Sequence, residues 1–202
     1  MFEILTTLGR TMGFSFAAGI NLYATVAILG LATRYGWVDL PSQYRVFDND
    51  IVIITALVLY VIEFVADKIP WLDSVWDAVH TAIRPLGGAV IAVATLGDAS
   101  PTVTGLIALL GGTLATSTHL TKAGARAAAN TSPEPFSNWL LSFAEDLFVV
   151  GLGTIALKFP LVAALIVIAG VTLILVFATW IIRAVRKRWK LPPASSQLPA
   201  AG

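Results

Sequence analysis

Charged side chains in this otherwise apolar sequence are concentrated in one stretch, from Val61 to Gly88. Glu63 and Asp67 lie at the end of an apolar run that begins at Ile51. An ionised carboxylate at membrane depth costs about 2.5–3.5 kcal/mol unless it is paired, hydrated or protonated. Both acids are therefore candidates for ion pairing, proton exchange or cation binding.

A polar stripe follows directly after these two acids. Asp73, Asp77, His80 and Arg84 recur at i, i+4, i+7 and i+11, which puts them on one face of a helix. One interpretation is an amphipathic helix at the membrane interface with a solvated polar face. The other is a functional stripe, which its position between two apolar segments favours. The spacing predicts one amphipathic helix and leaves both interpretations open.

Two further polar residues interrupt the apolar segment Thr11–Thr33. Within Gly19-Ile20-Asn21-Leu22-Tyr23, Asn21 and Tyr23 bring an amide and a phenol to mid-membrane depth. Small residues there can mark a close helix crossing, with Asn21 bonded to a neighbouring helix. Alternatively, the helix is broken or re-entrant, and Asn21 faces a polar cavity.

The second half of the chain carries its own buried-charge candidates. His119, Lys122 and Arg126 end an apolar segment, and Glu145-Asp146 lies near the centre of the next. A lone histidine is commonly a hydrogen-bonded packing residue, although cationic neighbours also fit a proton relay. Two adjacent acids cannot both face lipid, so at least one of them is expected to point inward.

Composition defines the class of protein that contains these residues. The chain has 202 residues, 57% of them hydrophobic and 12% charged, with a mean hydropathy of +0.82 and a net charge of +1. These values predict an all-α polytopic membrane protein whose partner is the lipid bilayer. The weak net charge and the lack of a basic, aromatic-rich surface argue against nucleic acid. Homo-oligomers are compatible with the sequence.

Six apolar segments are candidates to span or re-enter a bilayer. The third is too short to cross alone, so it must borrow a turn from the preceding helix or re-enter. A basic cluster, Arg183 to Lys190, follows the last segment and predicts a cytoplasmic C-terminus. Six crossings then put both termini in the cytoplasm of a bacterium, with the chain in its inner membrane. We expect one membrane domain, 1–190, and a disordered tail, 191–202. The segments are Thr11–Thr33, Ile51–Asp67, Pro85–Gly97, Pro101–Thr121, Phe136–Leu157 and Leu161–Ile182.

The two halves of this domain, about 1–98 and 99–190, can be aligned with each other. The alignment sets Asn21 against His119 and Glu63 against Glu145. It predicts inverted repeats of three crossings each, with two interrupted helices that meet at a polar midplane site.

Three motifs carry a resemblance to a known family. They are Gly-x-Asn-x-Tyr at Gly19, Asp-Lys-x-Pro at Asp67 and Arg-Pro-x-x-Gly-Ala at Arg84. With them, roughly residues 10 to 180 resemble a family of small bacterial integral membrane proteins, with plastid relatives, that is catalogued as a domain of unknown function. The resemblance implies a multi-span membrane fold and supplies neither a substrate nor a mechanism.

Two classes of function fit these features. The first is a small secondary transporter or channel in which Asn21 and His119 line a site, while Glu63 and Glu145 exchange a proton or bind a cation. Its solute would be a small ion, an anionic solute or a lipid phosphate, since Lys68, Arg84, Lys122 and Arg126 can hold phosphate. The second is a structural or accessory protein whose buried charges only fix helix packing.

An enzyme is not expected, because the chain has no zinc-ligand spacing, nucleophile elbow or phosphate loop. Glu63 and Asp67, at i and i+4, suit a metal no better than an ion pair with Lys68 or Arg84. The sequence therefore predicts no metal and no cofactor.

Overall fold

A computed structural model describes residues 2–131 and 136–189, and all regular structure within these ranges is helical. This confirms the all-α class. The tail predicted for 191–202 lies outside the described residues. The elements are α1 (Phe2–Ile20), α2 (Leu22–Arg34), the 3₁₀ helix η1 (Ser42–Phe47), α3 (Asp50–Ala66), α4 (Pro70–Leu96), α5 (Pro101–Ala129), α6 (Phe136–Lys158) and α7 (Pro160–Trp189).

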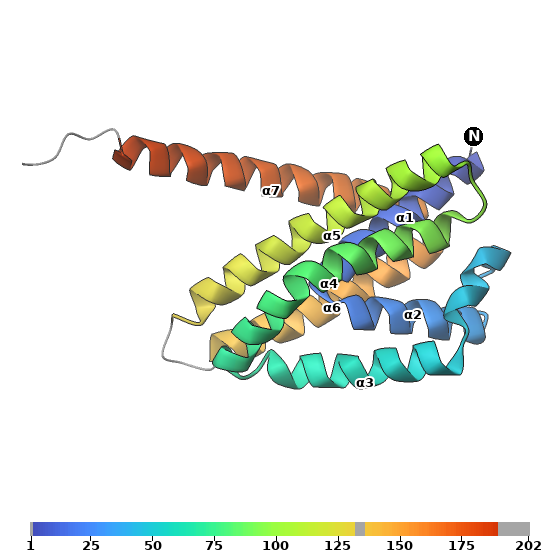
Figure 1. The fold of residues 1–202 in the computed structure, drawn as a ribbon, viewed down its shortest axis with the longest axis horizontal. Coiled ribbons are helices and arrows are strands. Elements are labelled where there is room, and N and C mark those ends of the chain that lie inside the picture. The colour runs from blue at the N-terminus through green and yellow to red at the C-terminus, as the bar shows by residue number, and fades with distance from the viewer. Residues whose placement is uncertain (1, 132–135, 190–202) are drawn as a thin grey trace, which may run out of the picture.

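The first predicted span is broken at Asn21, as one of its two interpretations expected. Asn21 has an extended backbone (φ −144°, ψ 100°), and its side-chain oxygen accepts a hydrogen bond from the Ala24 N–H at 2.9 Å. An asparagine in this position is a favourable N-cap, and here it starts α2. Gly153 lies near both Phe14 of α1 and Ile28 of α2. The chain therefore turns back on itself, and α2 returns toward the end of the bundle where α1 began (Figure 1). We call this unit the α1–α2 hairpin.

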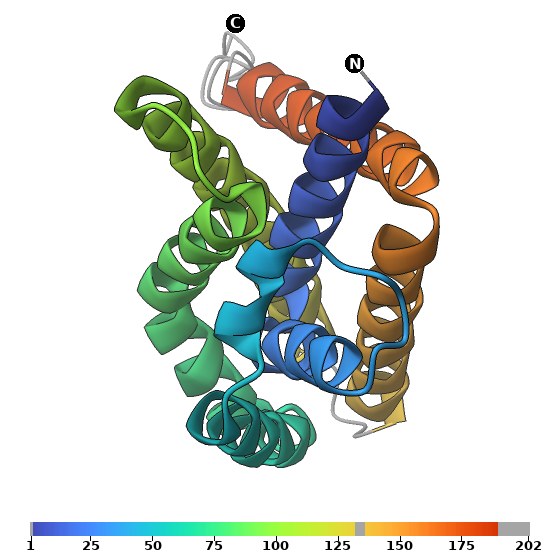
Figure 2. The ribbon, with the colours of Figure 1, turned by 90° about the vertical axis from the view of Figure 1, so that its right-hand side faces the viewer.

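The hairpin lies at the centre of the molecule. α1 contacts α4, α5, α6 and α7, which surround it in the view of Figure 2. Phe14, Ala17 and Ala18 are fully buried at this centre. Small residues permit the close approach, since a Cβ added to Gly13 would meet Ala156 and Ala163. The core of the fold is therefore built around α1.

Four helices, α4, α5, α6 and α7, are long and apolar enough to cross a membrane among the residues that the structure describes. The most apolar of them, α7, has a mean hydropathy of 3.0 and exposes large side chains such as Leu165 and Leu173. Apolar side chains facing outward are expected where the surroundings are lipid. These helices support a multi-pass membrane protein.

The amphipathic helix and the short segment Pro85–Gly97, predicted as separate elements, form the single helix α4. Gly87 and Gly88 lie inside it. Gly88 packs against Gly111 and Ala115 of α5, and Gly87 packs against Leu22. The two glycines therefore serve close helix packing and do not end the helix.

The predicted second interrupted helix is not observed, because α5 runs unbroken from Pro101 to Ala129. The hydroxyl groups of Thr116 and Ser117 donate to carbonyls of the preceding turn, at 2.7 and 2.8 Å. These side chains are thus satisfied within the helix and do not require a break.

The start of α1 and the end of α7 are at opposite ends of the bundle (Figure 1). The α1–α2 hairpin contributes to this arrangement, because α2 returns toward the end at which α1 begins.

Candidate functional site

The polar stripe of α4 faces the interior. Asp73, Asp77 and Arg84 are 1%, 6% and 0% exposed, whereas Val75 and Val79 on the opposite face are 54% and 56% exposed. His80 is buried as well. The interpretation as a solvated stripe is therefore wrong. In a bundle surrounded by lipid, the apolar face is the outer face, so the charges must find partners inside.

Arg84 joins this stripe to the break in the hairpin. Its Nη2 donates to Glu63 Oε1 at 2.6 Å, and its Nη1 donates to the Gly19 carbonyl at 3.3 Å. Nη1 is also 3.4 Å from Asp77 Oδ1. Carbonyls in the last turn of a helix lack helical donors and form the negative end of its dipole. Arg84 therefore stabilises the C-terminus of α1 as well as a carboxylate.

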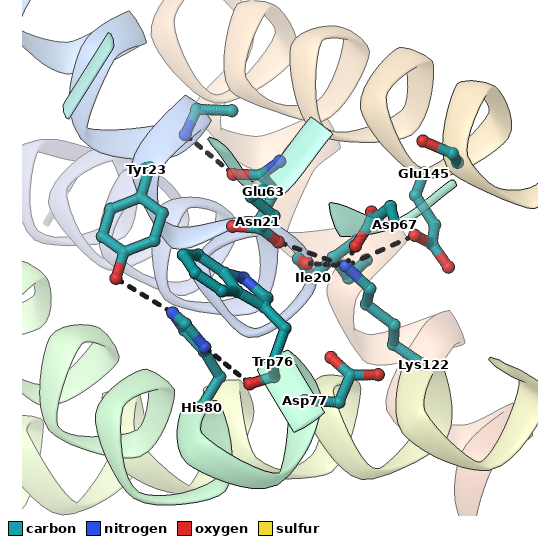
Figure 3. A network of polar contacts seen from close by, with 12 residues as sticks. Ile20, Asn21, Tyr23, Glu63, Asp67, Trp76, Asp77, His80, Lys122 and Glu145 are labelled. Atoms are coloured by element: carbon teal, nitrogen blue, oxygen red, sulfur yellow. Dashed lines mark hydrogen bonds and ion pairs between the residues drawn. The ribbon is translucent and has the colours of Figure 1, made fainter. Parts of the chain in front are cut away.

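Lys122 of α5 reaches the same break. Its Nζ donates to the Ile20 carbonyl at 3.2 Å, to Glu63 Oε1 at 3.2 Å and to Asp67 Oδ2 at 3.3 Å (Figure 3). Glu145 Oε2 is 3.4 Å away. An ammonium group has three protons, so the three donated bonds use all of them.

Arg126 holds the other side of the network. It binds both oxygens of Glu145, through Nε at 3.1 Å and Nη2 at 2.6 Å. Nη2 also donates to Asp67 Oδ2 at 2.9 Å, and Nη1 donates to the carbonyls of Asp67 and Asn138 at 2.9 and 3.2 Å. These contacts use all five N–H donors of the guanidinium.

The hydrogen bonds assign His119 to one neutral tautomer. Arg84 Nη1 can only donate, so His119 Nδ1, at 2.8 Å, accepts. The remaining proton is then on Nε2, which is 3.0 Å from Thr81 Oγ1. Thr81 in turn donates to the Asp77 carbonyl at 3.0 Å. This arrangement fits the hydrogen-bonded packing residue rather than a proton relay.

His80 carries a proton on Nδ1, because that nitrogen is 2.7 Å from the Trp76 carbonyl, which can only accept. Its Nε2 forms a hydrogen bond with the Tyr23 hydroxyl at 2.9 Å (Figure 3). The Trp76 ring stacks on the His80 ring, with centroids 4.6 Å apart. Tyr23 therefore anchors the start of α2 to α4.

Asn21 and Lys68 are the remaining predicted site residues. Asn21 Nδ2 donates to Asp146 Oδ1 at 3.2 Å, which brings an acid to the N-terminus of α2, where the helix dipole favours negative charge. Lys68 lies at the edge. Its Nζ donates to the Phe64 carbonyl at 2.8 Å and to Ser142 Oγ at 3.3 Å, and it stands 3.0 Å from the centre of the Phe64 ring.

The structure thus gathers thirteen of the fourteen predicted residues around the break, with Lys68 at the margin. Sequence reasoning missed Asn130 and Asn138. Asn130 donates to Asp73 Oδ2 at 3.0 Å and accepts from Asn138 Nδ2 at 2.6 Å. Helical spacing is the signal that could have found both, because Asn130 follows Arg126 at i+4 and Asn138 precedes Glu145 by seven residues. We call the acidic and basic members around the break the charge network: Glu63, Asp67, Asp73, Asp77, Arg84, Lys122, Arg126, Glu145 and Asp146.

The charge network contains more acids than bases. It has six carboxylates and three cations, and one oxygen on each of five carboxylates has no hydrogen-bond partner among the described residues. Uncompensated buried charge is costly, so such a cluster gains stability by taking up a proton or a small cation. No group of three or more His, Asp or Glu suited to a metal ion occurs in the described part of the chain. The five oxygens are Glu63 Oε2, Asp67 Oδ1, Asp73 Oδ1, Asp77 Oδ1 and Asp146 Oδ2.

A helical bundle with four membrane-length apolar helices and its charges turned inward defines a multi-pass membrane protein. Within that class, the chain belongs to the family described as domain of unknown function (DUF4126), which matches residues 8–184 and so covers the whole charge network. No curated protein matches the chain, and no solved structure does.

Proposed function

We propose that this protein is a small secondary transporter in which the charge network couples solute movement to a proton or a small cation. The observation that supports it most directly is the buried helix break, which contacts a cluster with more carboxylates than cations. Broken helices with ion sites at their ends are a recurrent arrangement in carriers.

Glu63 is the residue best suited to coupling. A single oxygen, Oε1, accepts from both Arg84 and Lys122, and these two cations also hold the last carbonyls of α1. Protonation of Glu63 would weaken both ion pairs. Arg84 and Lys122 would then interact mainly with the hairpin carbonyls and with the other acids. The occupancy of one carboxylate would thereby bias the position of the α1–α2 hairpin, which is the two-state element that coupling needs.

Two openings suit access to the network. One is a cavity of about 200 Å³ between α4 and α5, lined by Asp73, Asp77 and Arg126. The other is a mostly apolar groove of about 340 Å³, to which Lys122 and Glu145 contribute beside Phe16 of α1 and Leu173 of α7. A solute could reach the charge network from the end of the bundle through the first and from its side through the second.

For the membrane, we propose that the α1–α2 hairpin enters and returns while α3 to α7 cross. At 17 residues, α3 is at the short end of the range for a span. The basic end of α7 would be cytoplasmic and the start of α1 would lie on the opposite side. This replaces the six crossings and the inverted repeats expected from the sequence.

The structural or accessory role is the second candidate. It is favoured by the complete use of the N–H donors of Lys122 and Arg126, which is also what a purely architectural network requires.

The test is ion-linked flux in reconstituted vesicles that contain a trapped pH-sensitive dye, screened over small cations, anions and phosphates. Glu63→Gln keeps the side-chain volume and removes the titratable group. We expect it to fold and to lose proton- or cation-linked flux at least tenfold. Asp50→Asn, at the exposed start of the same helix α3, is the matched control and should transport like the parent.

Equal flux in the parent and in Glu63→Gln would refute the coupling role of Glu63. A parent that moves no solute, together with a Glu63→Gln variant of reduced stability, would establish the structural role.

A further inference from the structure

The cavity between the start of α4 and the end of α5 carries a second, more specific feature. Its volume is about 200 Å³, and Asn130 at the end of α5 is among its lining residues. We propose that this α4–α5 cavity binds a primary ammonium cation with a short aliphatic group. This inference rests on the proposed function, for which it names the class of solute. The lining residues are Asp73, Ser74, Asp77, Ala78, Thr81, Ala123, Arg126, Ala127 and Asn130.

Two buried oxygens in the lining are available to accept hydrogen bonds. Asp73 and Asp77 are each more than nine-tenths buried, and the Oδ1 atom of each has no hydrogen-bond partner among the described residues. They are one helical turn apart on the same face of α4, so both can be reached from one position. A buried carboxylate oxygen without a donor is costly, so a ligand that supplies N–H groups is favoured.

The nearby cations donate no hydrogen bond to these two oxygens. Arg126 directs all five of its N–H donors to Asp67, Glu145 and Asn138. Its Nη1 is 3.9 Å from Asp73 Oδ1, which is beyond hydrogen-bond distance. Arg84 Nη1 forms an ion pair with Asp77 Oδ1 at 3.4 Å but directs its hydrogen bonds to Gly19 and His119. Asp73 therefore keeps a negative charge that no bound cation neutralises, and Asp77 keeps an oxygen without a donor.

The hydroxyl groups of the lining are also engaged. Ser74 Oγ donates to the Pro70 carbonyl at 3.0 Å, and Thr81 Oγ1 donates to the Asp77 carbonyl at 3.0 Å. The lining therefore offers two carboxylate oxygens that accept no hydrogen bond, fewer than the six or more oxygens that a hard metal cation prefers. Two of the three N–H protons of a primary ammonium group would bond to these oxygens.

The rest of the lining suits a short alkyl group. Ala78, Ala123 and Ala127 contribute methyl groups beside the two acids. Since a water molecule occupies about 30 Å³ of the liquid, the cavity has room for roughly six waters, or for an ammonium with two to four carbons. One end of the cavity is thus polar and acidic, and its walls are apolar.

Thermal unfolding of the detergent-solubilised full chain tests the site. Propylammonium chloride should raise the unfolding midpoint in a saturable manner, because a ligand that binds only the folded state stabilises it by mass action. Tetramethylammonium chloride, which has the same charge and no N–H donor, and sodium chloride should give no saturable shift at equal ionic strength. Asp73→Asn and Asp77→Asn should weaken the apparent affinity at least tenfold, and Asp39→Asn, an exposed acid outside the cavity, should not.

One further variant covers the case in which the two asparagine variants fail to fold. Ala123→Leu fills the cavity while both acids stay in place, and it should abolish the propylammonium shift. No saturable shift in the parent, an equal shift with tetramethylammonium, or a full shift in Ala123→Leu would each overturn the proposal. The assay measures binding without transport. A failed site therefore leaves proton coupling through Glu63 untouched, and a failed flux assay leaves this site standing.

Discussion

At the scale of single residues, Arg126 makes the most contacts in the charge network. It binds Glu145 through two parallel N–H···O bonds and donates to the side chain and the carbonyl of Asp67. Only a planar guanidinium offers five donors in this fixed arrangement, so lysine is not equivalent here. The network depends on the shape of this group as well as on its charge.

Arg126→Gln should lower the free energy of unfolding by about 3–5 kcal/mol, because it removes one of the two cations that Asp67 and Glu145 share. Arg126→Lys should recover only part of this loss. Arg34→Gln removes a partly exposed ion pair with Asp48 and should cost far less. Unfolding of the three variants by titration with a denaturing detergent measures the difference. Losses of similar size at Arg126 and Arg34 would show that the buried network contributes little to stability.

At the scale of secondary-structure elements, the α1–α2 hairpin depends on close packing at its tip. Gly19 precedes the break and lies directly against α5, where an added Cβ would overlap Thr118 Oγ1 and the Ala115 carbonyl. Thr118 Oγ1 also donates to the Phe16 carbonyl at 3.0 Å. The tip therefore has no room for a side chain at Gly19, and its carbonyl stays within reach of Arg84.

Gly19→Ala should destabilise the fold by about 1–3 kcal/mol, because the overlap forces α1 away from α5. Gly105→Ala, in α5, is the matched control. An added Cβ there meets open space, so alanine should be neutral or stabilising by up to about 1 kcal/mol. Thermal unfolding in detergent compares the two variants. Equal behaviour would show that the hairpin tip is loosely packed.

At the scale of the whole molecule, the hairpin determines which end of the bundle each segment reaches. The η1 region lies at the end where α1 begins, and the end of α5 and the end of α7 lie at the other (Figure 1). The basic residues that follow α7 favour the cytoplasm for that end.

The chain has no native cysteine, so single cysteines report sidedness without interference. Cysteines at Glu3 and Ser42 should react with a membrane-impermeant maleimide from outside the cell. Cysteines at Thr131 and Ala184 should react only after the membrane is opened. Protection of Glu3 together with labelling of Ser42 would restore the arrangement in which the first segment crosses the membrane.

The sequence by itself determined the class of the protein and the residues of the network. Composition gave an all-helical membrane protein, and the high cost of isolated charge in an apolar chain singled out Glu63, Arg84 and Lys122 before any fold was known. The Gly19-to-Tyr23 motif left two alternatives, a close helix crossing or a broken helix, and the structure shows the break, with Asn21 as the N-cap of α2.

Only the tertiary structure decided which way these features face. A period of 3.6 residues shows that Asp73 and Asp77 share a helix face but not whether water or protein covers it, and here neighbouring helices cover it. The alignment of the two halves predicted a second interrupted helix, yet α5 is unbroken, and α4 runs through its two glycines without a break. Hydrogen bonds within α5 satisfy the hydroxyl groups of Thr116 and Ser117, and the glycines let α4 and α5 approach. Local sequence does not encode such long-range partners. Tertiary packing therefore decided the path of the α1–α2 hairpin, the end of the bundle that each end of the chain reaches, and which acid pairs with which base.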